Sequence, residues 1–294
     1  MSAARYRPEM TRAGLEPTYP ASAVDEFGEA REARIAGELP LTIYVDRREI
    51  VTLMTLGTFP EALTLGYLKN QGLIDDIRNV VSVHVDWDVN AAAVRTRDGI
   101  GDWEEKLARR TVTTGCGQGT VYGDVMEQLG KVRLPRPRTA QSVIYSLLAR
   151  LSRENEIYKS AGAVHGCALC LDDQVLTFIE DVGRHNAVDA IAGLMWLDGV
   201  DGGDKIFYTT GRLTSEMVIK VAQMGIPVLL SRSGITRMGL ELARQVGVTM
   251  ISRAKGRHFL VFNGADNIVF DAIPDVPAEA RARGPLRRSA SETP

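Results

Sequence analysis

The second half of the chain alternates between two patterns of apolar and polar positions. Short apolar runs, which predict buried strands, are separated by segments whose apolar residues recur at helical spacing. The predicted strands cover 174–179, 205–210, 226–231, 248–252 and 258–262, and the predicted helices begin at residues 186, 215 and 236. Strands that alternate with helices in this way predict βαβ crossovers and a mostly parallel sheet.

The first half has a shorter and more mixed pattern. Strand pairs are predicted at 41–45 with 50–54 and at 80–85 with 91–96, and a helix begins at Pro60 between them. Another helix is predicted over 141–151, after Pro135 and Pro137. Both ends of the chain are polar, and such segments bury too little apolar surface to fold. We therefore predict an α/β protein (α+β overall) with a disordered segment 1–38, a smaller mixed domain 39–135, an α/β ligand-binding domain 136–273 and a disordered tail 274–294.

Four loops follow the predicted parallel strands, at 180–186, 210–216, 231–237 and 252–257, and each contains arginine and glycine. Because the carboxyl ends of parallel strands lie at one edge of a sheet, these loops are expected to converge there. Arginine makes bidentate contacts with phosphate, and helix N-termini add unpaired N–H groups. The pattern predicts a site for a ligand with several phosphates, and four turns with solvated arginines are the alternative. The predicted binding residues are Arg184, Arg212, Arg232, Ser252, Arg253, Ala254, Lys255, Gly256 and Arg257.

Cys116 is the candidate nucleophile of the chain. It lies between Gly115 and Gly117, downstream of Arg109 and Arg110. The glycines favour an accessible loop, and cationic neighbours favour the thiolate form of cysteine. A turn that contains a small buried side chain is the alternative.

The composition argues against several classes of protein. The chain of 294 residues has a formal net charge of −2, so its overall charge does not favour nucleic acid as a partner. Its three cysteines, an odd number, do not suggest a disulfide framework and fit a reducing compartment. We see neither a secretory signal nor an apolar run long enough to span a bilayer, so we expect a cytoplasmic protein with no membrane partner.

Several segments carry a resemblance to a known family. They are Gly115–Gly117, Glu180–Asp189 with the sequence EDVGRHNAVD, Arg212–Ala222 and Gly225–Leu229. With these segments the chain resembles the FdhD/NarQ family from about Leu41 to Phe262, which is nearly all of the part predicted to be ordered.

The resemblance implies a sulfur carrier required for active formate dehydrogenase. Cys116 would accept persulfide sulfur from a cysteine desulfurase, in a sulfurtransferase-type reaction, and pass it to molybdenum or tungsten in bis-molybdopterin guanine dinucleotide. The phosphates and guanines of that substrate fit the arginine loops. The resemblance also implies a ligand contact for His185, a three-layer C-terminal domain similar to the cytidine-deaminase fold, and a homodimer. No tightly held metal is expected, and a non-catalytic chaperone that holds the molybdenum cofactor for insertion is the alternative.

The chain departs from the family pattern at two places. The family loop usually has a second cysteine at the position of Gly119, so a relay between neighbouring thiols is in doubt. Where family members tend to have Val-His-Ala-Ala, Val164–Cys170 places Cys167 and Cys170 beside His165. These side chains could bind a soft metal, supply the missing thiol or lie in the core, and the sequence leaves the three readings open. The segment lacks the glutamate and the proline of the zinc deaminase signature, which argues against deaminase activity.

Overall fold

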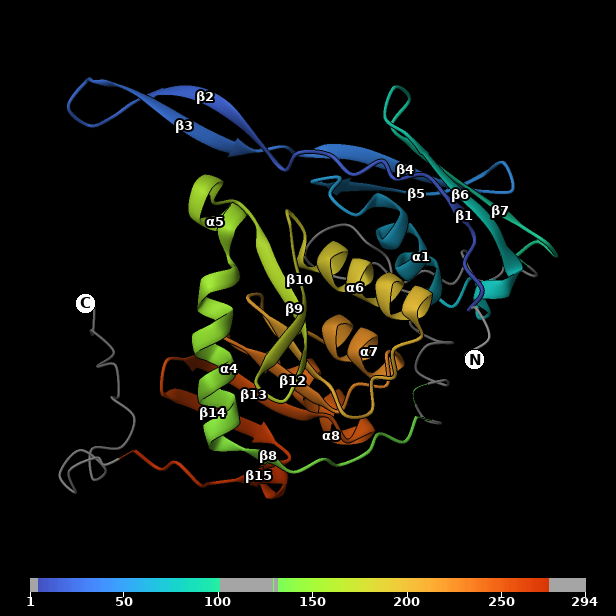
Figure 1. Cartoon of the computed structure of the whole chain (residues 1–294). Coiled ribbons are helices and arrows are strands. Elements are labelled where there is room, and N and C mark those ends of the chain that lie inside the picture. Colours follow the sequence, from blue (N-terminus) through green and yellow to red (C-terminus); the bar gives the residue numbers. More distant parts are fainter. Residues whose placement is uncertain (1–4, 101–128, 130–131, 275–294) are drawn as a thin grey trace, which may run out of the picture.

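The structure is a computed structural model, and it describes residues 5–100, 129 and 132–274. It is a mixed α/β fold with two main sheets, one from each half of the chain (Figure 1). The loop of Cys116 and residues 275–294 of the predicted tail lie outside the described residues.

The first half forms a five-stranded sheet in the order β1-β6-β7-β4-β5. Alternate residues of its strands point to one buried face, as Leu41, Ile43 and Val45 do on β4. This face packs against helix α1 (Pro60–Asn70), which begins at Pro60 as predicted. The strands are β1 (Glu9–Met10), β4 (Leu39–Val45), β5 (Arg48–Thr55), β6 (Val80–Asp86) and β7 (Ala91–Thr96), so both predicted strand pairs are confirmed.

The second half forms a six-stranded sheet in the order β10-β9-β11-β12-β13-β14. Its strands are β9 (His165–Leu171), β10 (Gln174–Asp181), β11 (Ile206–Thr209), β12 (Val228–Ser231), β13 (Thr249–Lys255) and β14 (His258–Asn263). Only β11, β12 and β13 pair in parallel, so the prediction of a mostly parallel sheet needs correction. The sequence did not predict strand β9, whose segment was left open as a metal site, a relay thiol or part of the core. It inserts antiparallel between β10 and β11.

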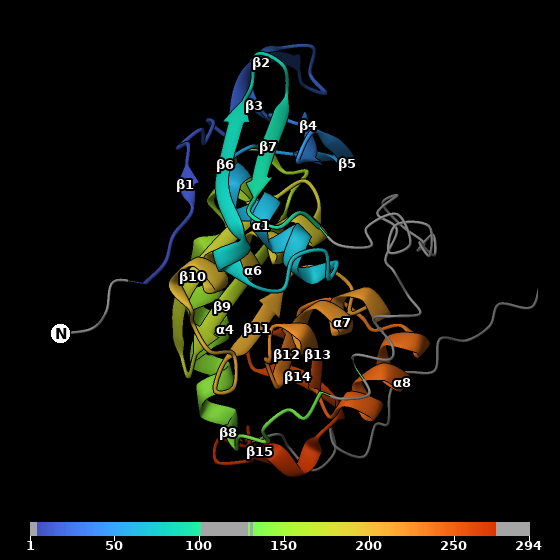
Figure 2. The same ribbon diagram turned by 90° about the vertical axis from the view of Figure 1, so that its right-hand side faces the viewer.

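Helices cover both faces of this sheet (Figures 1 and 2). One apolar core joins the sheet to α6 (Arg184–Asp198), α7 (Ser215–Gln223) and α8 (Arg237–Val246). A second core, on the opposite face, joins it to α4 (Gln141–Glu154). The four predicted helices of this half are therefore confirmed, and the sheet lies between two helical layers.

The two halves share one continuous core instead of separate ones, because α1 packs directly on α6. A Cβ atom on Gly66 would lie 1.7 Å from the carbonyl oxygen of Asp189, and one on Gly193 would lie 1.9 Å from that of Ala62. The two glycines thus let the backbones of the helices touch. The rim of the second sheet is consequently held against the first half of the chain.

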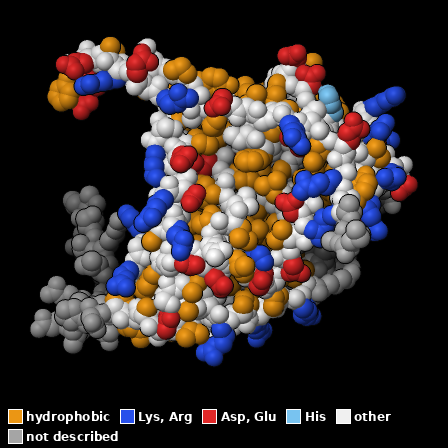
Figure 3. All heavy atoms as spheres, viewed as in Figure 1, with side chains coloured by type: hydrophobic (Ala, Val, Ile, Leu, Met, Phe, Trp, Pro, Cys, Tyr) orange, Lys and Arg blue, Asp and Glu red, His pale blue; other side chains and the backbone are white. Residues whose placement is uncertain are grey.

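The prediction that residues 1–38 are disordered is wrong for the part that the structure describes. Strands β2 (Thr18–Val24) and β3 (Ala30–Ala36) form an antiparallel hairpin that extends from the body (Figures 1 and 3), and β1 joins the first sheet beside β6. The turn between β2 and β3 is closed by Asp25, whose carboxylate accepts hydrogen bonds from the amides of Phe27 and Glu29. The hairpin residues are mostly small or polar, so the apolar alternation that predicts a strand is missing.

The remaining elements are short. They are α5 (Glu156–Ala161), β8 (Thr139–Ala140) paired with β15 (Ile268–Val269), and the 3-10 turns η1 (Ile77–Asn79) and η2 (Ala265–Asn267). None of the helices within the described ranges has the length and apolar character needed to cross a membrane.

Candidate functional site

The four arginine-containing loops do meet at one edge of the second sheet, and we call residues 180–186, 210–216, 231–237 and 252–257 the rim. Strand β9 runs antiparallel to both β10 and β11, so β10 points the same way as the parallel strands β11, β12 and β13. Neighbouring loops are joined by backbone hydrogen bonds, from the amide of Leu213 to Gly234 O and from that of Arg253 to Ser233 O. The predicted convergence of the loops is confirmed.

His165, at the start of β9, is under the influence of the positive charges of three rim arginines. Its imidazole is half-buried and lies 3.4 Å from the hydroxyl of Thr210. Burial lowers its pKa, and the positive charges of Arg184, Arg232 and Arg212 lower it further. This position beside the rim is thus under the field of cations from three separate loops, which is an arrangement suited to an anion.

A cavity of about 460 Å³ opens at one side of the rim. Its wall combines the rim residues Arg232, Ala254, Lys255 and Gly256 with Tyr158 of α5. The guanidinium of Arg232 lies 5.4 Å from the centre of the Tyr158 ring, close enough for a cation–π contact. The volume is within the range of small-molecule sites in proteins. Nothing in the sequence signalled the tyrosine, because it reaches the rim from a helix that precedes the sheet.

The predicted binding residues differ in burial. Arg184 and His185 begin helix α6 and are 5% and 3% exposed. The side chain of Arg184 fits against Gly211, where a Cβ atom would lie 2.6 Å from its Cδ. Its Nε has no hydrogen-bond partner among the described residues, and neither does Oγ of Ser252. Ala254 is also buried, whereas the exposed members of the set are Arg212, Arg232, Arg253, Lys255, Gly256 and Arg257. In Figure 3, Lys and Arg side chains line the edge of the body below the hairpin.

Most polar residues of the EDVGRHNAVD motif stabilise the fold around the rim. Glu180 accepts hydrogen bonds from the amides of Ile157 and Tyr158 and so holds the first turn of α5. Asp181 accepts hydrogen bonds from Thr55 Oγ1 and from the amide of Leu56, at the end of β5. These carboxylates therefore fix the rim to its surroundings.

Asn186 and Asp189 continue this attachment along α6. Asn186 donates hydrogen bonds to Asp181 and to the carbonyl oxygen of Met54. Asp189 accepts a hydrogen bond from Asn70 of α1 and forms a buried ion pair with Lys220 of α7. The motif is thus largely a joint between the two halves of the chain.

Cys167 and Cys170 are core residues. They are three positions apart on β9, so their side chains point to opposite faces of the sheet, and each packs in a different apolar core. Burial raises the pKa of each thiol to about 12. The described part of the chain contains no group of three or more His, Cys, Asp or Glu side chains arranged to hold a metal. Of the three readings, the structure supports the core and contradicts both a metal site and an accessible relay thiol.

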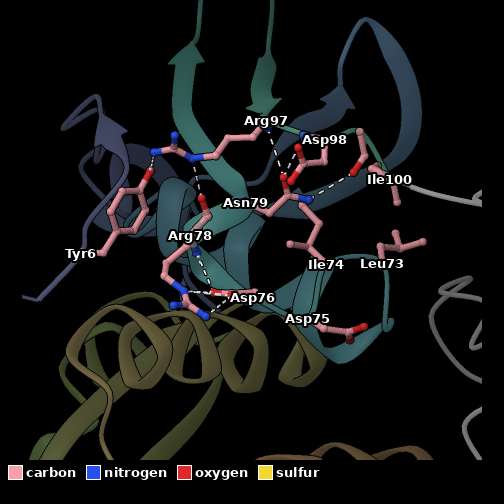
Figure 4. Close-up of a pocket in the computed structure, with 11 residues that line it drawn as sticks. Tyr6, Leu73, Ile74, Asp75, Asp76, Arg78, Asn79, Arg97, Asp98 and Ile100 are labelled. Carbon is pink, nitrogen blue, oxygen red and sulfur yellow. Dashed lines mark hydrogen bonds and ion pairs between the residues drawn. The ribbon is translucent and has the colours of Figure 1, made fainter.

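A second hollow, of about 640 Å³, lies beside the first sheet and contains none of the predicted site residues (Figure 4). Its polar side chains are largely paired with one another. Arg78 forms an ion pair with Asp76, and Arg97 donates to the carbonyl oxygen of Arg78 and lies over the Tyr6 ring. Paired charges of this kind leave few groups to bind a ligand.

The family model described as the FdhD/NarQ family matches residues 36–269, and the chain belongs to this family. Among similar proteins is a sulfur carrier protein FdhD from Halalkalibacterium halodurans, with 30% identity over 74% of this chain and 82% of the relative. Another, from Listeria monocytogenes serovar 1/2a, has 28% identity over 81% of this chain and 92% of the relative.

A solved structure has a similar fold. It is the crystal structure of a protein assigned as a formate dehydrogenase accessory protein from Desulfotalea psychrophila, with a TM-score of 0.68 and 26% identity. The similarity covers 86% of this chain and 98% of that one. It extends over both sheets and not over one of them alone.

Proposed function

We propose that this protein is a sulfur carrier in the maturation of formate dehydrogenase. In this proposal Cys116 accepts sulfur from a cysteine desulfurase and passes it to the metal centre of bis-molybdopterin guanine dinucleotide, which is a substrate here. Membership of the FdhD/NarQ family and the names of the relatives support the role. The observation that carries it is the convergence of arginines from separate loops on one rim, because this substrate has several phosphates.

The rim offers different surroundings to the different parts of such a substrate. Exposed Arg212 and Arg253 are available for phosphates, and charge-assisted contacts of this kind are strong. The cavity beside Tyr158 has an aromatic ring and a volume of about 460 Å³, which suits one nucleotide end and not the whole molecule. We therefore assign one guanine nucleotide moiety to this cavity.

The sulfur chemistry requires one accessible thiolate. The Cys116 thiolate would attack the terminal sulfur of the desulfurase persulfide, so that a new S–S bond forms and the desulfurase thiolate leaves. Release of that sulfur as sulfide breaks the new bond and takes two electrons from a thiol or another reductant. Cys167 and Cys170, with pKa values of about 12, would contribute almost no thiolate at neutral pH.

The second candidate function is a non-catalytic chaperone that binds the cofactor for insertion into the dehydrogenase. One observation favours it. Gly119 stands where the family loop has its second cysteine, and the structure places Cys167 and Cys170 in the core. No thiol among the described residues replaces the missing one. The rim would bind the same ligand in either function, so only sulfur transfer distinguishes them.

Mass spectrometry after incubation with a cysteine desulfurase and cysteine tests the carrier. A gain of one sulfur on the peptide that contains Cys116 is expected, and Cys116→Ala should lose both the gain and the activation of formate dehydrogenase. Full activation by Cys116→Ala would favour the chaperone instead.

Calorimetry with GDP tests the rim. Removal of one arginine–phosphate contact should weaken binding about tenfold to a hundredfold. We expect this for Arg232→Ala and for Lys255→Ala/Arg257→Ala, with a smaller loss at high salt because these side chains are exposed. Arg150→Ala is the matched control, because it removes an exposed arginine of α4 that forms an ion pair with Asp173. Unchanged affinity in both rim variants would contradict the proposed site.

Three finer statements belong to the same proposal. They are a homodimer, a location in the cytoplasm, and a C-terminal half with the layout of the cytidine-deaminase fold. The sheet between two helical layers supports the last of these. Analytical ultracentrifugation tests whether the protein is a homodimer.

A further inference from the structure

The β2–β3 hairpin has uncovered apolar side chains where it extends from the body (Figures 1 and 3). Phe27, in its turn, is 79% exposed and is the most exposed large apolar side chain among the described residues. Val24, at the end of β2, is 71% exposed, and the cross-strand partners Tyr19 and Ile35 are exposed as well. A two-stranded hairpin on its own is only marginally stable in water, and exposed apolar surface of this kind marks an interaction site.

The turn fixes the backbone around Phe27 before any partner binds. Asp25 Oδ1 accepts 3.0 Å hydrogen bonds from the amides of Phe27 and Glu29, and Asp25 Oδ2 accepts a 2.7 Å hydrogen bond from Nε of Arg31. Gly28 has the positive φ of 81° that the turn requires. An aromatic side chain on a turn that is already ordered costs little conformational entropy to bind, which suits an interface anchor.

The end of the hairpin is acidic. Residues 25–32 contain four acidic side chains and one arginine, and this Arg31 forms ion pairs with Asp25 and Glu29. Glu26 and Glu32 add negative charge on exposed side chains. A partner with a basic surface and an apolar pocket for an aromatic ring complements this end of the hairpin.

The hairpin lies beside the cavity that we assign to a guanine nucleotide. Helix α5 connects the two, because it contacts β3 and contributes Tyr158 to the cavity wall (Figure 1). Glu180 of the rim holds the same helix through hydrogen bonds from the amides of Ile157 and Tyr158. A protein bound to the hairpin is therefore next to a ligand on the rim.

The charges of the rim and the hairpin indicate which protein this is. A protein that receives a polyanionic cofactor from the rim must bind the same phosphates, so its surface around that site is positively charged. The arginines of the rim repel such a surface, whereas the acidic end of the hairpin attracts it. A desulfurase delivers sulfur and not the phosphate-bearing cofactor, so the same argument does not apply to it.

We propose that the β2–β3 hairpin is the docking arm for formate dehydrogenase, with Phe27 as the apolar anchor and Glu26 and Glu32 as charged contacts. The inference rests on the proposed function for the identity of the acceptor. The arm precedes the part of the chain matched by the family model except for residue 36, where that match begins and β3 ends. It holds the acceptor at the rim while the cofactor passes from one protein to the other.

Binding of the full-length chain to cofactor-free formate dehydrogenase from the same organism tests the arm, and biolayer interferometry measures it. Phe27→Ser should weaken the affinity about tenfold to a hundredfold, mainly through faster dissociation. Glu26→Lys/Glu32→Lys keeps the turn bonds of Asp25 and should slow association at low salt, and the difference from wild type should disappear at high salt. Both variants should activate the dehydrogenase less than wild type at limiting carrier concentration.

The turn between β6 and β7 offers matched controls. Val89 in this turn is 68% exposed and Asp88 beside it is also exposed, so Val89→Ser and Asp88→Lys repeat the two kinds of change on a second strand pair. Both controls should bind the dehydrogenase as wild type does. All the variants should give the same calorimetric result with GDP as wild type, because none of them changes the rim.

The outcomes separate the two proposals. If wild-type protein does not activate the dehydrogenase, the proposed function is wrong, and so is the partner inferred from it. If wild type activates the enzyme and Phe27→Ser binds and activates it equally well, the docking arm is wrong although the proposed function stands. If Phe27→Ser instead turns a dimer into a monomer, or weakens only the binding of a desulfurase, the hairpin has a different partner and the inference is overturned.

Discussion

Acid should destabilise this protein through His185. In the folded chain burial lowers the pKa of this imidazole to about 2, whereas an unfolded histidine has a pKa of about 6.5. Between these values the unfolded chain binds one more proton than the folded chain. The free energy of unfolding therefore falls as the pH falls below about 6.5.

The size of the effect follows from the two pKa values. Each pH unit below 6.5 removes about 1.4 kcal/mol, and between pH 7 and pH 5 the loss comes to about 2 kcal/mol. His165 contributes in the same direction, because its pKa is also lowered by burial and by the rim arginines. Burial raises the pKa of Asp181 and Asp189, which has the opposite effect over the range where those carboxyls titrate.

Comparison with His185→Gln isolates the contribution of the one imidazole. Glutamine can donate an N–H to Glu216 but does not titrate, and the effects of the other groups are common to both proteins. Urea unfolding at pH 7, 6 and 5 should give a wild-type stability that falls about 2 kcal/mol more than that of the variant. Equal pH dependence in the two proteins would refute a neutral, buried His185.

Two further predictions concern packing and the thiols. Gly66→Ala should lower the free energy of unfolding by about 3 kcal/mol or more, because the new Cβ would lie 1.7 Å from a backbone oxygen of α6. Gly234→Ala is the control and should change the free energy of unfolding little, because no atom lies within 4 Å of its new Cβ. Urea unfolding measures both variants, and a mild effect of Gly66→Ala would mean that α1 can move away from α6. Iodoacetamide at pH 8 should leave Cys167 and Cys170 unmodified in the folded protein and alkylate both in urea, because burial raises their pKa to about 12. Rapid labelling of either cysteine in the folded chain would show an accessible thiol, and it would contradict the assignment of Cys167 and Cys170 to the core.

Local patterns in the sequence were sufficient for most of the elements. The apolar runs and helical spacing of the second half predict β10 to β14 and α6 to α8, because each of these elements buries one face that its own residues define. The arginine-containing loops were predictable for the same reason, since they follow strands that point one way. To predict that these loops converge, only one rule was needed, namely that the carboxyl ends of parallel strands lie at the same edge of a sheet.

Elements that depend on distant partners were missed. Strand β9 was missed because its pairing with β10 and β11 is not encoded locally, and the sequence left its cysteines open as a metal site, a relay thiol or core residues. The β2–β3 hairpin is held by backbone pairing between small and polar residues, which have no apolar period. Tyr158 enters the cavity wall from a separate helix.

The sequence by itself thus determined which residues make the rim, because charge, glycine and strand ends are adjacent in the chain. Only the tertiary structure decided how those residues are held. The carboxylates of the EDVGRHNAVD motif join the two halves, and Lys220 of α7 lies between Asp189 of α6 and Glu216. The contacts of Asp181 with Thr55 and of Asp189 with Lys220 link residues that are 126 and 31 positions apart. A buried charged side chain depends on the partner that the packing brings to it, and local sequence patterns do not show that partner.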